Sequence, residues 1–216
     1  MRMRKKKHRD ERISACSDLL IENPEMLMND PTFAFPDKSL PLALEIGCGK
    51  GNFAVGMAQK RHDINLIAME KVPDVCCVAL EKAMRQKDAR PDNLRFVIGN
   101  ADNLNEWFPE HSVNFLFLNF SDPWPKAGHA KRRLTHLNFL EKYKRIIKPG
   151  GTLYFKTDNE GLFNFSLEQF ALGGLEVVWT SRDLHRSDRA DGNIMTEYEM
   201  SFSEKGFPIY MAEVRF

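Results

Sequence analysis

Residues 42–51 read LALEIGCGKG, and this stretch decides the fold. Its first half, Leu42 to Ile46, is a short apolar run that predicts a buried strand. Its second half holds Gly47, Gly49 and Gly51, which allow the backbone to turn tightly, to approach a ligand closely and to start a helix. The third glycine comes one residue too early for the dinucleotide spacing G-x-G-x-x-G, which counts against NAD.

The alternation of strands and helices continues along the chain. Further strands are predicted at Ile64–Met69, Leu94–Ile98, Val113–Leu118, Thr152–Lys156 and Leu175–Trp179. Helices are predicted at Asn52–Arg61, Pro73–Lys87, Leu134–Ile147 and Leu162–Leu172. This order predicts an α/β fold, a Rossmann-like and mostly parallel sheet with helices on both faces. The last two segments, Glu197–Ser203 and Ile209–Phe216, are predicted to form an antiparallel hairpin at the sheet edge.

Length and composition indicate one domain over residues 1–216, with a core at 41–216. Residues 1–40 are expected to be a basic, irregular extension, broken by Pro24, Pro31 and Pro36. The net charge is +1, so any binding of a polyanion must come from local basic clusters. The four cysteines include no Cys-x-x-Cys pair, which indicates neither disulfides nor a zinc site and fits a reducing cytoplasm. No apolar run approaches the length of a membrane span, and we expect no membrane partner.

Acidic side chains stand at the ends of the first two predicted strands, where ligands of parallel sheets bind. Glu45 precedes the glycine turn, and Glu70 follows the second strand. A carboxylate at the second position can accept both hydroxyls of a ribose, so the pattern predicts a cofactor that contains adenosine. Asn100, after the third strand, could meet the edge of the adenine. The alternatives are a simple tight turn, a solvent-facing strand end and a helix cap.

The fourth predicted strand leads into Asn119–Lys126, NFSDPWPK. Here Asp122 stands beside Pro123 and Pro125, which limit backbone freedom. The basic triplet Lys131-Arg132-Arg133 follows closely. This combination indicates a site for chemistry on a flat, polar substrate such as a nucleic acid. An ordinary turn that starts at Asp122-Pro123 is the alternative.

Residues 45–51 resemble motif I of the class I S-adenosylmethionine-dependent methyltransferases. With residues 119–126, the triplet 131–133, FKTDN at 155–159 and TEYE at 196–199, the chain resembles the bacterial tRNA (guanine-N7-)-methyltransferases of the TrmB family. The resemblance covers nearly all of residues 42–216. It implies the seven-stranded class I fold, S-adenosylmethionine as cofactor, and tRNA as the partner. The implied reaction methylates N7 of guanosine 46 in the tRNA variable loop. Related enzymes are monomers or homodimers, and the sequence leaves both open.

The same resemblance implies the roles of single residues. Cofactor contacts are implied at Glu45, Gly47, Gly49, Gly51, Glu70, Asn100, Ala101 and Asp122. Substrate contacts are implied at Lys126, Asp158, Thr196, Glu197, Tyr198 and Glu199. RNA contacts are implied at Gly128, His129, Ala130, Lys131, Arg132 and Arg133. The family usually has Asp where this chain has Asn100, and Asn keeps an acceptor for the adenine amino group but loses the charge.

Guanine N7 carries an exposed lone pair and no proton, so the reaction needs no general base. Methylation leaves the purine cationic, and a carboxylate such as Asp122 matches that charge. Asp158 and Glu199 are candidates to accept the two donors of the guanine Watson–Crick edge. Trp124 could stack on the base or pack in the core, and Lys126 could contact RNA or pair with Asp122. The basic run Arg2 to Arg12 could bind phosphates or be a solvated face.

Two rival functions remain open at this point. One is a methyltransferase for a small molecule or an exocyclic amine, a class that often has Asn/Asp-Pro-Pro followed by an aromatic residue after the fourth strand. In this chain Trp124 stands in place of the second proline, which counts against that class of methyltransferase. The other is a catalytically silent RNA-binding module. Asn100 favours that function, whereas Glu45, Glu70 and Asp122 count against it.

Overall fold

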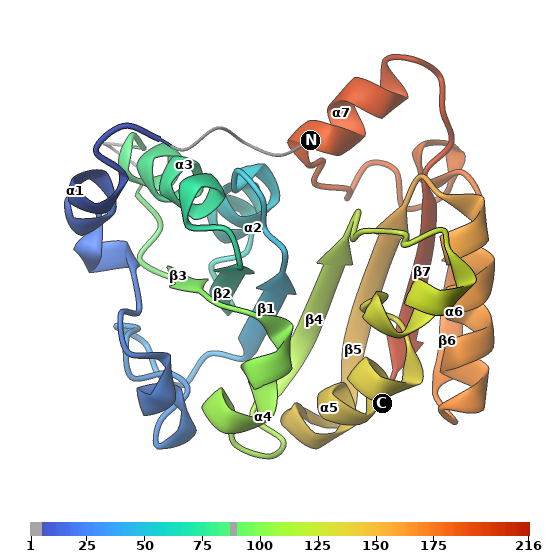
Figure 1. Cartoon of the computed structure of the whole chain (residues 1–216), viewed down its shortest axis with the longest axis horizontal. Helices are drawn as coiled ribbons and strands as arrows, with labels where there is room; N and C mark the ends of the chain where they lie inside the picture. The colour runs from blue at the N-terminus through green and yellow to red at the C-terminus, as the bar shows by residue number, and fades with distance from the viewer. Residues whose placement is uncertain (1–5, 87–89) are drawn as a thin grey trace. The chain divides into compact units, whose positions relative to one another are not determined.

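The computed structural model describes residues 6–86 and 90–216. It divides into two compact units, Met1–Pro109 (unit 1) and Glu110–Phe216 (unit 2), which Figure 1 shows with their helices and strands. The single domain expected over residues 1–216 stays a prediction.

Unit 1 contains a parallel three-stranded part of the sheet. Its elements are α1 (Arg9–Ser14), η1 (Ser17–Leu19), η2 (Pro24–Met28), β1 (Leu42–Ile46), α2 (Asn52–Lys60), β2 (Asn65–Glu70), α3 (Pro73–Met84), β3 (Leu94–Ile98), η3 (Ala101–Asn103) and α4 (Leu104–Trp107), where η marks a 3₁₀ helix. The strand order is β3-β2-β1, and both pairs are parallel. All residues of β1 and β2 are buried, as their apolar runs predicted. Helix α3 ends at Met84, and Lys87, its predicted end, lies outside the described residues.

The expectation that residues 1–40 are irregular is wrong in part. Its described part holds the short helices α1, η1 and η2, and its apolar side chains pack. Leu19 and Leu27 are 1% and 0% exposed. The backbone N–H of Ile21 donates to the carbonyl of Phe96 at 2.9 Å, beside an isolated parallel bridge between Leu20 and Phe96. The segment therefore belongs to the packed body of unit 1.

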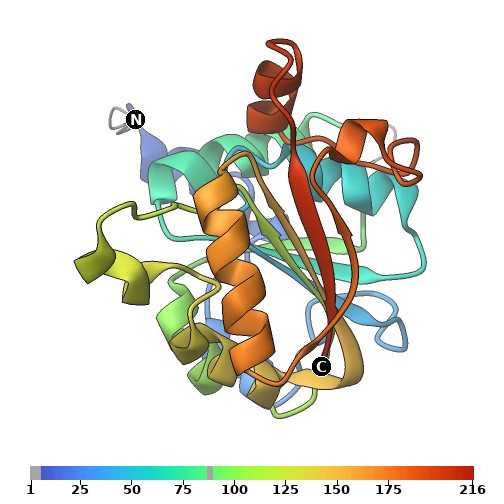
Figure 2. The ribbon, with the colours of Figure 1, turned by 90° about the vertical axis from the view of Figure 1, so that its right-hand side faces the viewer.

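Unit 2 contains a mixed four-stranded part of the sheet. Its elements are β4 (Val113–Asn119), η4 (Ala127–Arg132), α5 (Leu137–Ile146), β5 (Ile147–Thr157), α6 (Glu160–Leu172), β6 (Glu176–Ser181), η5 (Leu184–Arg186), α7 (Glu197–Ser203) and β7 (Tyr210–Arg215). The order is β4-β5-β7-β6, with β4 parallel to β5 and β7 antiparallel to both neighbours. Helix α6 contacts β5, β6 and β7 and runs along one face of these strands in Figure 2.

The strand predicted at Glu197–Ser203 is wrong, because these residues form helix α7. Alternating apolar residues suggested a strand, but Thr196 and Glu199 form a capping box that starts a helix. The Thr196 hydroxyl accepts from the backbone N–H of Glu199 at 2.9 Å, and the Glu199 carboxylate accepts from that of Thr196 at 3.4 Å. The C-terminal strands are antiparallel as predicted, but the partners of β7 are β5 and β6.

The substitution Gly51→Ala is expected to lower the free energy of unfolding by about 2–4 kcal/mol. Gly51 has φ 82°, and a Cβ there would lie 2.8 Å from Cβ and 3.1 Å from Cα of Ala79 in α3. The variant would therefore be destabilised both by backbone strain at position 51 and by a clash with Ala79. Urea unfolding followed by circular dichroism measures the change.

The matched control is Gly128→Ala. A Cβ at Gly128 would meet no described atom within 4 Å, so this variant should stay within about 1 kcal/mol of the wild type. Equal urea midpoints for the two variants would contradict the packing role of Gly51.

Candidate active site

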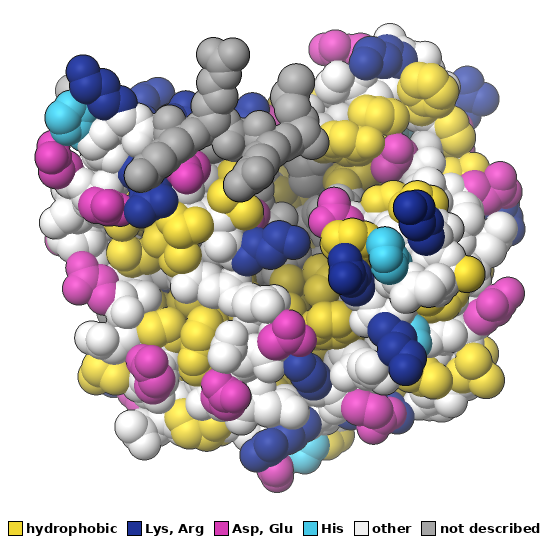
Figure 3. Space-filling view, in the orientation of Figure 1, with side chains coloured by type: hydrophobic (Ala, Val, Ile, Leu, Met, Phe, Trp, Pro, Cys, Tyr) yellow, Lys and Arg dark blue, Asp and Glu magenta, His cyan; other side chains and the backbone are white. Residues whose placement is uncertain are grey.

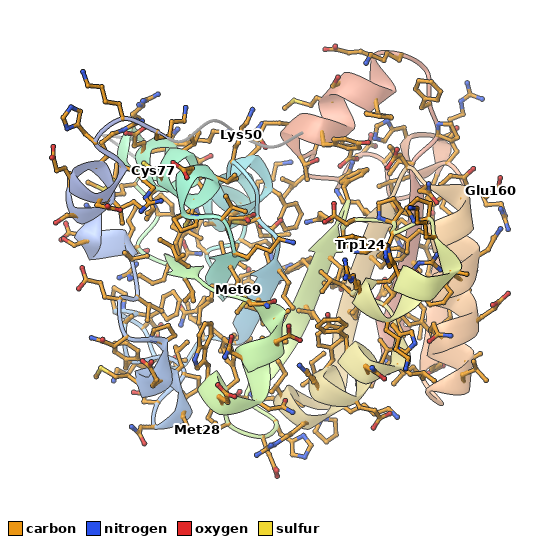
Figure 4. All side chains as sticks on the ribbon, viewed as in Figure 1. Met28, Lys50, Met69, Cys77, Trp124 and Glu160 are labelled. Carbon is orange, nitrogen blue, oxygen red and sulfur yellow. The ribbon has the colours of Figure 1, made fainter. Side chains whose placement is uncertain are left out.

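The turn between β1 and α2 is built from backbone. The N–H groups of Gly47 and Cys48 both donate to the carbonyl of Met69, at 2.8 and 3.0 Å. Gly47, Gly49 and Gly51 have φ values of 81°, 59° and 82°. A Cβ at Gly47 or Gly49 would meet no described atom within 4 Å. The turn, marked by Lys50 in Figure 4, thus leaves room at these two positions for a ligand to approach the backbone.

Glu70, at the end of β2, holds its carboxylate against this turn. One oxygen accepts from the N–H of Gly49 at 3.1 Å, and the other from the N–H of Val72 at 2.9 Å. The side chain is buried, and this burial raises the pKa of Glu70 although hydrogen bonds from the backbone of Val72, Gly49 and Lys71 oppose the shift. A carboxylate oxygen can accept more than one hydrogen bond. Glu70 therefore remains a candidate acceptor for the hydroxyls of a ligand.

Three other residues expected near the cofactor, Glu45, Asn100 and Ala101, also belong to unit 1. Glu45 is buried within β1. Asn100 caps η3, with its side-chain oxygen 3.4 Å from the N–H of Asp102, and Ala101 is buried behind it. The Asn100 amide also donates to the Asp102 carboxylate at 2.9 Å. The Asn100 side chain thus binds the carboxylate of a residue two positions later.

The loop after β4 presents Asp122 at an exposed position. Phe120 and Trp124, on either side of it, have positive φ values of 53° and 40°. The Phe120 N–H donates to the carbonyl of Lys156 in β5 at 2.9 Å, which ties the start of the loop to the sheet. Trp124 is half-buried and lies in this loop in Figure 4. The loop is therefore held in an unusual backbone conformation around an exposed carboxylate.

Helix η4 carries the basic cluster predicted beside this loop. Lys126, Gly128, Lys131 and Arg132 are exposed, and His129 and Ala130 are half-buried. The Arg132 guanidinium lies 5.0 Å from the centre of the Trp124 ring, and the His129 ring meets the edge of Trp124. Figure 3 shows cationic and histidine side chains gathered over this part of unit 2. Arg133 differs, because its guanidinium points back to the carbonyls of Pro123 and Trp124.

The structure brings together Asp158 and Tyr198, which the sequence placed on separate segments. The Tyr198 hydroxyl donates to the Asp158 carboxylate at 3.2 Å. Burial and the nearby carboxylate raise the pKa of Tyr198 to about 12, so the phenol stays protonated. The Tyr198 ring stacks on Phe202 at 4.3 Å and contacts Phe120 at 5.2 Å. An aromatic surface thus adjoins the start of the Asp122 loop.

Glu199 lies in helix α7 and not on the strand that was predicted at the sheet edge. Its side chain is fully buried and accepts from Lys156 Nζ at 2.7 Å and from Asn193 Nδ2 at 2.6 Å. His185 Nε2 lies 2.9 Å from the same carboxylate. In this conformation Glu199 holds α7 and the preceding loop to β5, and its predicted contact with substrate stays a prediction. Thr196 caps the helix, and Glu197 stands in its first turn.

Part of the basic N-terminal run is engaged within unit 1. Arg12 donates two hydrogen bonds to Glu81 of α3, at 2.7 and 2.8 Å, and these bonds lower the pKa of Glu81. Arg9 lies 3.6 Å from Asp74. Residues 2–5 of this run lie outside the described residues. Arg12 therefore has a structural partner, and the solvated-face alternative does not describe it.

Sequence reasoning gave no role to Lys156, His185 or Asn193. Lys156 was quoted only as part of a motif and as the end of a strand. A charged residue that ends an apolar strand was the available signal, because such a position is buried and its charge needs a partner. No sequence signal identified His185 or Asn193. Both contact Glu199 of α7, and Asn193 also accepts from Lys156 of β5.

Within residues 6–86 and 90–216, no group of three or more His, Cys, Asp or Glu side chains could hold a metal ion. Within the same residues, no helix has the length and apolar character needed to cross a membrane.

Known proteins are similar to this chain over most or all of its length. A family model described as "Putative methyltransferase" matches residues 39–212. The tRNA (guanine-N(7)-)-methyltransferase of Bacillus subtilis (strain 168) is 44% identical, with 99% of this chain and 98% of that protein covered. The protein of the same description from Lysinibacillus sphaericus (strain C3-41) is 43% identical, with 100% and 98% covered. The chain belongs to the tRNA (guanine-N(7)-)-methyltransferase family.

Solved structures agree on the fold of this family member. The 16S rRNA methyltransferase KamB matches with a TM-score of 0.61 at 12% identity, with 82% of this chain and 87% of that chain covered. An antibiotic-related methyltransferase matches with the same TM-score at 11% identity, with 99% and 96% covered. These likenesses confirm the predicted Rossmann-like methyltransferase fold, a seven-stranded mixed sheet with antiparallel C-terminal strands.

We expect Glu199→Gln to lower the free energy of unfolding by about 3–5 kcal/mol at neutral pH, because it removes the charge of a buried and paired carboxylate. Burial alone would raise the pKa of Glu199, but Lys156, His185 and Asn193 together hold it below 4.5. The carboxylate therefore stabilises the fold above pH 4.5, and this contribution is lost as the pH falls through the lowered pKa. In urea unfolding between pH 7 and 3, the wild type should lose stability more steeply than the variant.

The control is Glu160→Gln. Glu160, which Figure 4 labels, pairs with Arg182 at 2.8 Å, and both side chains are 60% exposed. Such an exposed pair contributes about 0–1 kcal/mol, so this variant should unfold like the wild type. Equal stability of Glu199→Gln and Glu160→Gln would contradict the structural role of Glu199.

Proposed function

We propose that the protein transfers the methyl group of S-adenosylmethionine to N7 of guanosine 46 in the variable loop of tRNA. The observation that carries this proposal is the 42–44% identity, over nearly the whole chain, to bacterial proteins described as tRNA (guanine-N(7)-)-methyltransferases. A tRNA substrate implies action in the cytoplasm. Membership of this family favours the tRNA enzyme over the small-molecule methyltransferase and over the silent RNA-binding module.

The glycine turn of unit 1 fits an adenosine-containing cofactor. Room above Gly47 and Gly49 allows close approach, and the Glu70 carboxylate beside Gly49 has the acceptors that a ribose needs. Gly51 lets the helix start directly behind the turn. Asn100 and Ala101, at the end of the next strand, would meet the adenine. Glu45 would support the turn from β1, and the cofactor contact of Asp122 stays a prediction.

When bound, S-adenosylmethionine supplies a methyl group on a sulfonium as the electrophile. The protein's own task is then alignment of the purine, which can contribute about 7–11 kcal/mol. Guanine N7 has no proton to lose, so no side chain needs to act as a base. Asp122 is the proposed catalytic residue, because an exposed carboxylate on a fixed loop favours the cationic methylated purine over neutral guanine.

The remaining predicted residues divide between the base and the RNA backbone. Asp158 and Tyr198, bonded to each other, would contact the target nucleoside together with Lys126. Thr196, Glu197 and Glu199 would act through α7, which carries Tyr198. Residues 128–132 of η4, of which Gly128, Lys131 and Arg132 are exposed, would lie against the phosphates. Because the target guanosine takes part in tertiary pairing, local opening of the tRNA accompanies binding.

The proposed reaction is tested by incubating unmodified tRNA with methyl-labelled S-adenosylmethionine and digesting the RNA for nucleoside mass spectrometry. The expected product is N7-methylguanosine at the variable-loop position. A control tRNA with adenosine at that position should remain unlabelled. Label in another nucleoside, or no label in any tRNA, would refute the proposal.

Asp122→Ala is expected to lower the single-turnover rate at least 100-fold, a change of about 2.7 kcal/mol or more in the activation free energy. The affinity for tRNA should stay within about threefold, because Asp122 repels phosphates and does not bind them. Quench-flow assays and filter binding measure the two effects. Glu168→Ala, an exposed acid on α6, is the control and should keep the wild-type rate. A wild-type rate in Asp122→Ala would remove its catalytic role.

A further inference from the structure

The loop that carries Asp122 has a backbone conformation that its own residues disfavour. Phe120 and Trp124 have φ values of 53° and 40°, a region that L-residues with bulky side chains rarely adopt. Trp124 also precedes Pro125, and a residue before proline prefers an extended conformation with negative φ. Pro123 and Pro125 fix their own φ angles and leave the angle of Trp124 open. Such strain persists only where the surroundings enforce it.

Arg133 supplies that enforcement. Its Nε donates to the carbonyl of Pro123 at 3.0 Å, and one terminal nitrogen donates to the carbonyl of Trp124 at 3.1 Å. These carbonyls belong to the two residues directly after Asp122. The fixed fork of a guanidinium suits two neighbouring acceptors. One side chain thus defines the direction of two successive peptide groups.

The guanidinium is itself held in place by unit 2. Its central carbon lies 4.3 Å from the centre of the Phe165 ring on α6, within the range of a cation–π contact. The backbone of Arg133 is bonded on both sides, to the carbonyl of Ala130 and to the N–H of His136, each at 3.0 Å. The loop is therefore fastened through Arg133 to a helix that packs on the sheet.

The three members of the basic triplet face different surroundings. Lys131 and Arg132 are exposed, whereas Arg133 is half-buried and faces protein carbonyls. We infer that Arg133 is a positioning residue that fixes the backbone around Asp122, and that it is not a phosphate contact as the family resemblance implied. This inference rests on the proposed methyl transfer to tRNA, because its effect is measured in that reaction.

The test compares Arg133→Met and Arg133→Lys with the wild type in single-turnover methylation of tRNA and in tRNA binding at several salt concentrations. A positioning role predicts a rate about 10- to 100-fold lower in both variants. Lysine keeps the charge but presents a single ammonium, so it cannot bridge both carbonyls. The affinity for tRNA should stay within about twofold, and its dependence on salt should be unchanged.

A phosphate contact predicts the opposite pattern. Arg133→Met would then weaken tRNA binding and lower the salt slope by about 1, and Arg133→Lys would restore both. That pattern, or a wild-type rate in either variant, would overturn the inference. Arg132→Met provides the contrast, because loss of a phosphate contact should lower its salt slope.

Controls separate this inference from folding and from the proposed function. Arg145→Lys and Arg145→Met change an arginine of α5 that pairs with Glu110 and is 48% exposed, and they should keep the wild-type rate. Thermal unfolding checks that each variant is folded. If Arg133→Met does not fold, Arg133→Lys decides alone. If wild-type protein leaves tRNA unmethylated, the proposed function fails, whereas a methylating wild type with unaffected Arg133 variants refutes only the positioning role.

Discussion

The burial of one ammonium group, that of Lys156, is the constraint on which the functional part of unit 2 depends. A buried ammonium is costly unless each of its three donors finds an acceptor. Asn193, Ile194 and Glu199 provide these acceptors, at 3.0, 2.9 and 2.7 Å. The backbone carbonyl of the same lysine receives the N–H of Phe120 at 2.9 Å. One residue at the end of β5 therefore fixes both the start of the Asp122 loop and the helix that carries Tyr198.

The candidate site residues of unit 1 and unit 2 differ in whether backbone or side-chain groups are presented. Unit 1 uses backbone, because a turn of glycines with positive φ exposes peptide groups that side chains would cover. Beside this turn lies the Glu70 side chain, whose carboxylate accepts from the backbone N–H groups of Gly49 and Val72. Unit 2 uses side chains on a strained loop and a capped helix. Arg133 holds this loop through two carbonyls, and Lys156 holds the helix through Glu199.

Two residues that sequence motifs assigned to substrate or RNA contacts also have partners within the protein. Arg133 and Glu199 both belong to sequence motifs that suggest contact with substrate or RNA. The structure gives each of them protein partners, since Arg133 binds loop carbonyls and Glu199 binds a buried lysine. A motif marks residues that the function requires, but it does not separate those that touch the substrate from those that hold the touching residues in place.

The sequence by itself determined the alternation of strands and helices, the bounds of β1 and β3 and the glycine turn, because apolar period and turn residues are local signals. The helix at residues 197–203 escaped prediction because its apolar residues alternate as in a strand, although the capping box of Thr196 and Glu199 is a local signal for a helix. Only the tertiary structure joined Lys156 to Glu199, 43 residues along the chain, and Arg133 to the carbonyls of the Asp122 loop, 9 and 10 residues before it. In neither case does a local pattern of residues encode which charge will meet which partner.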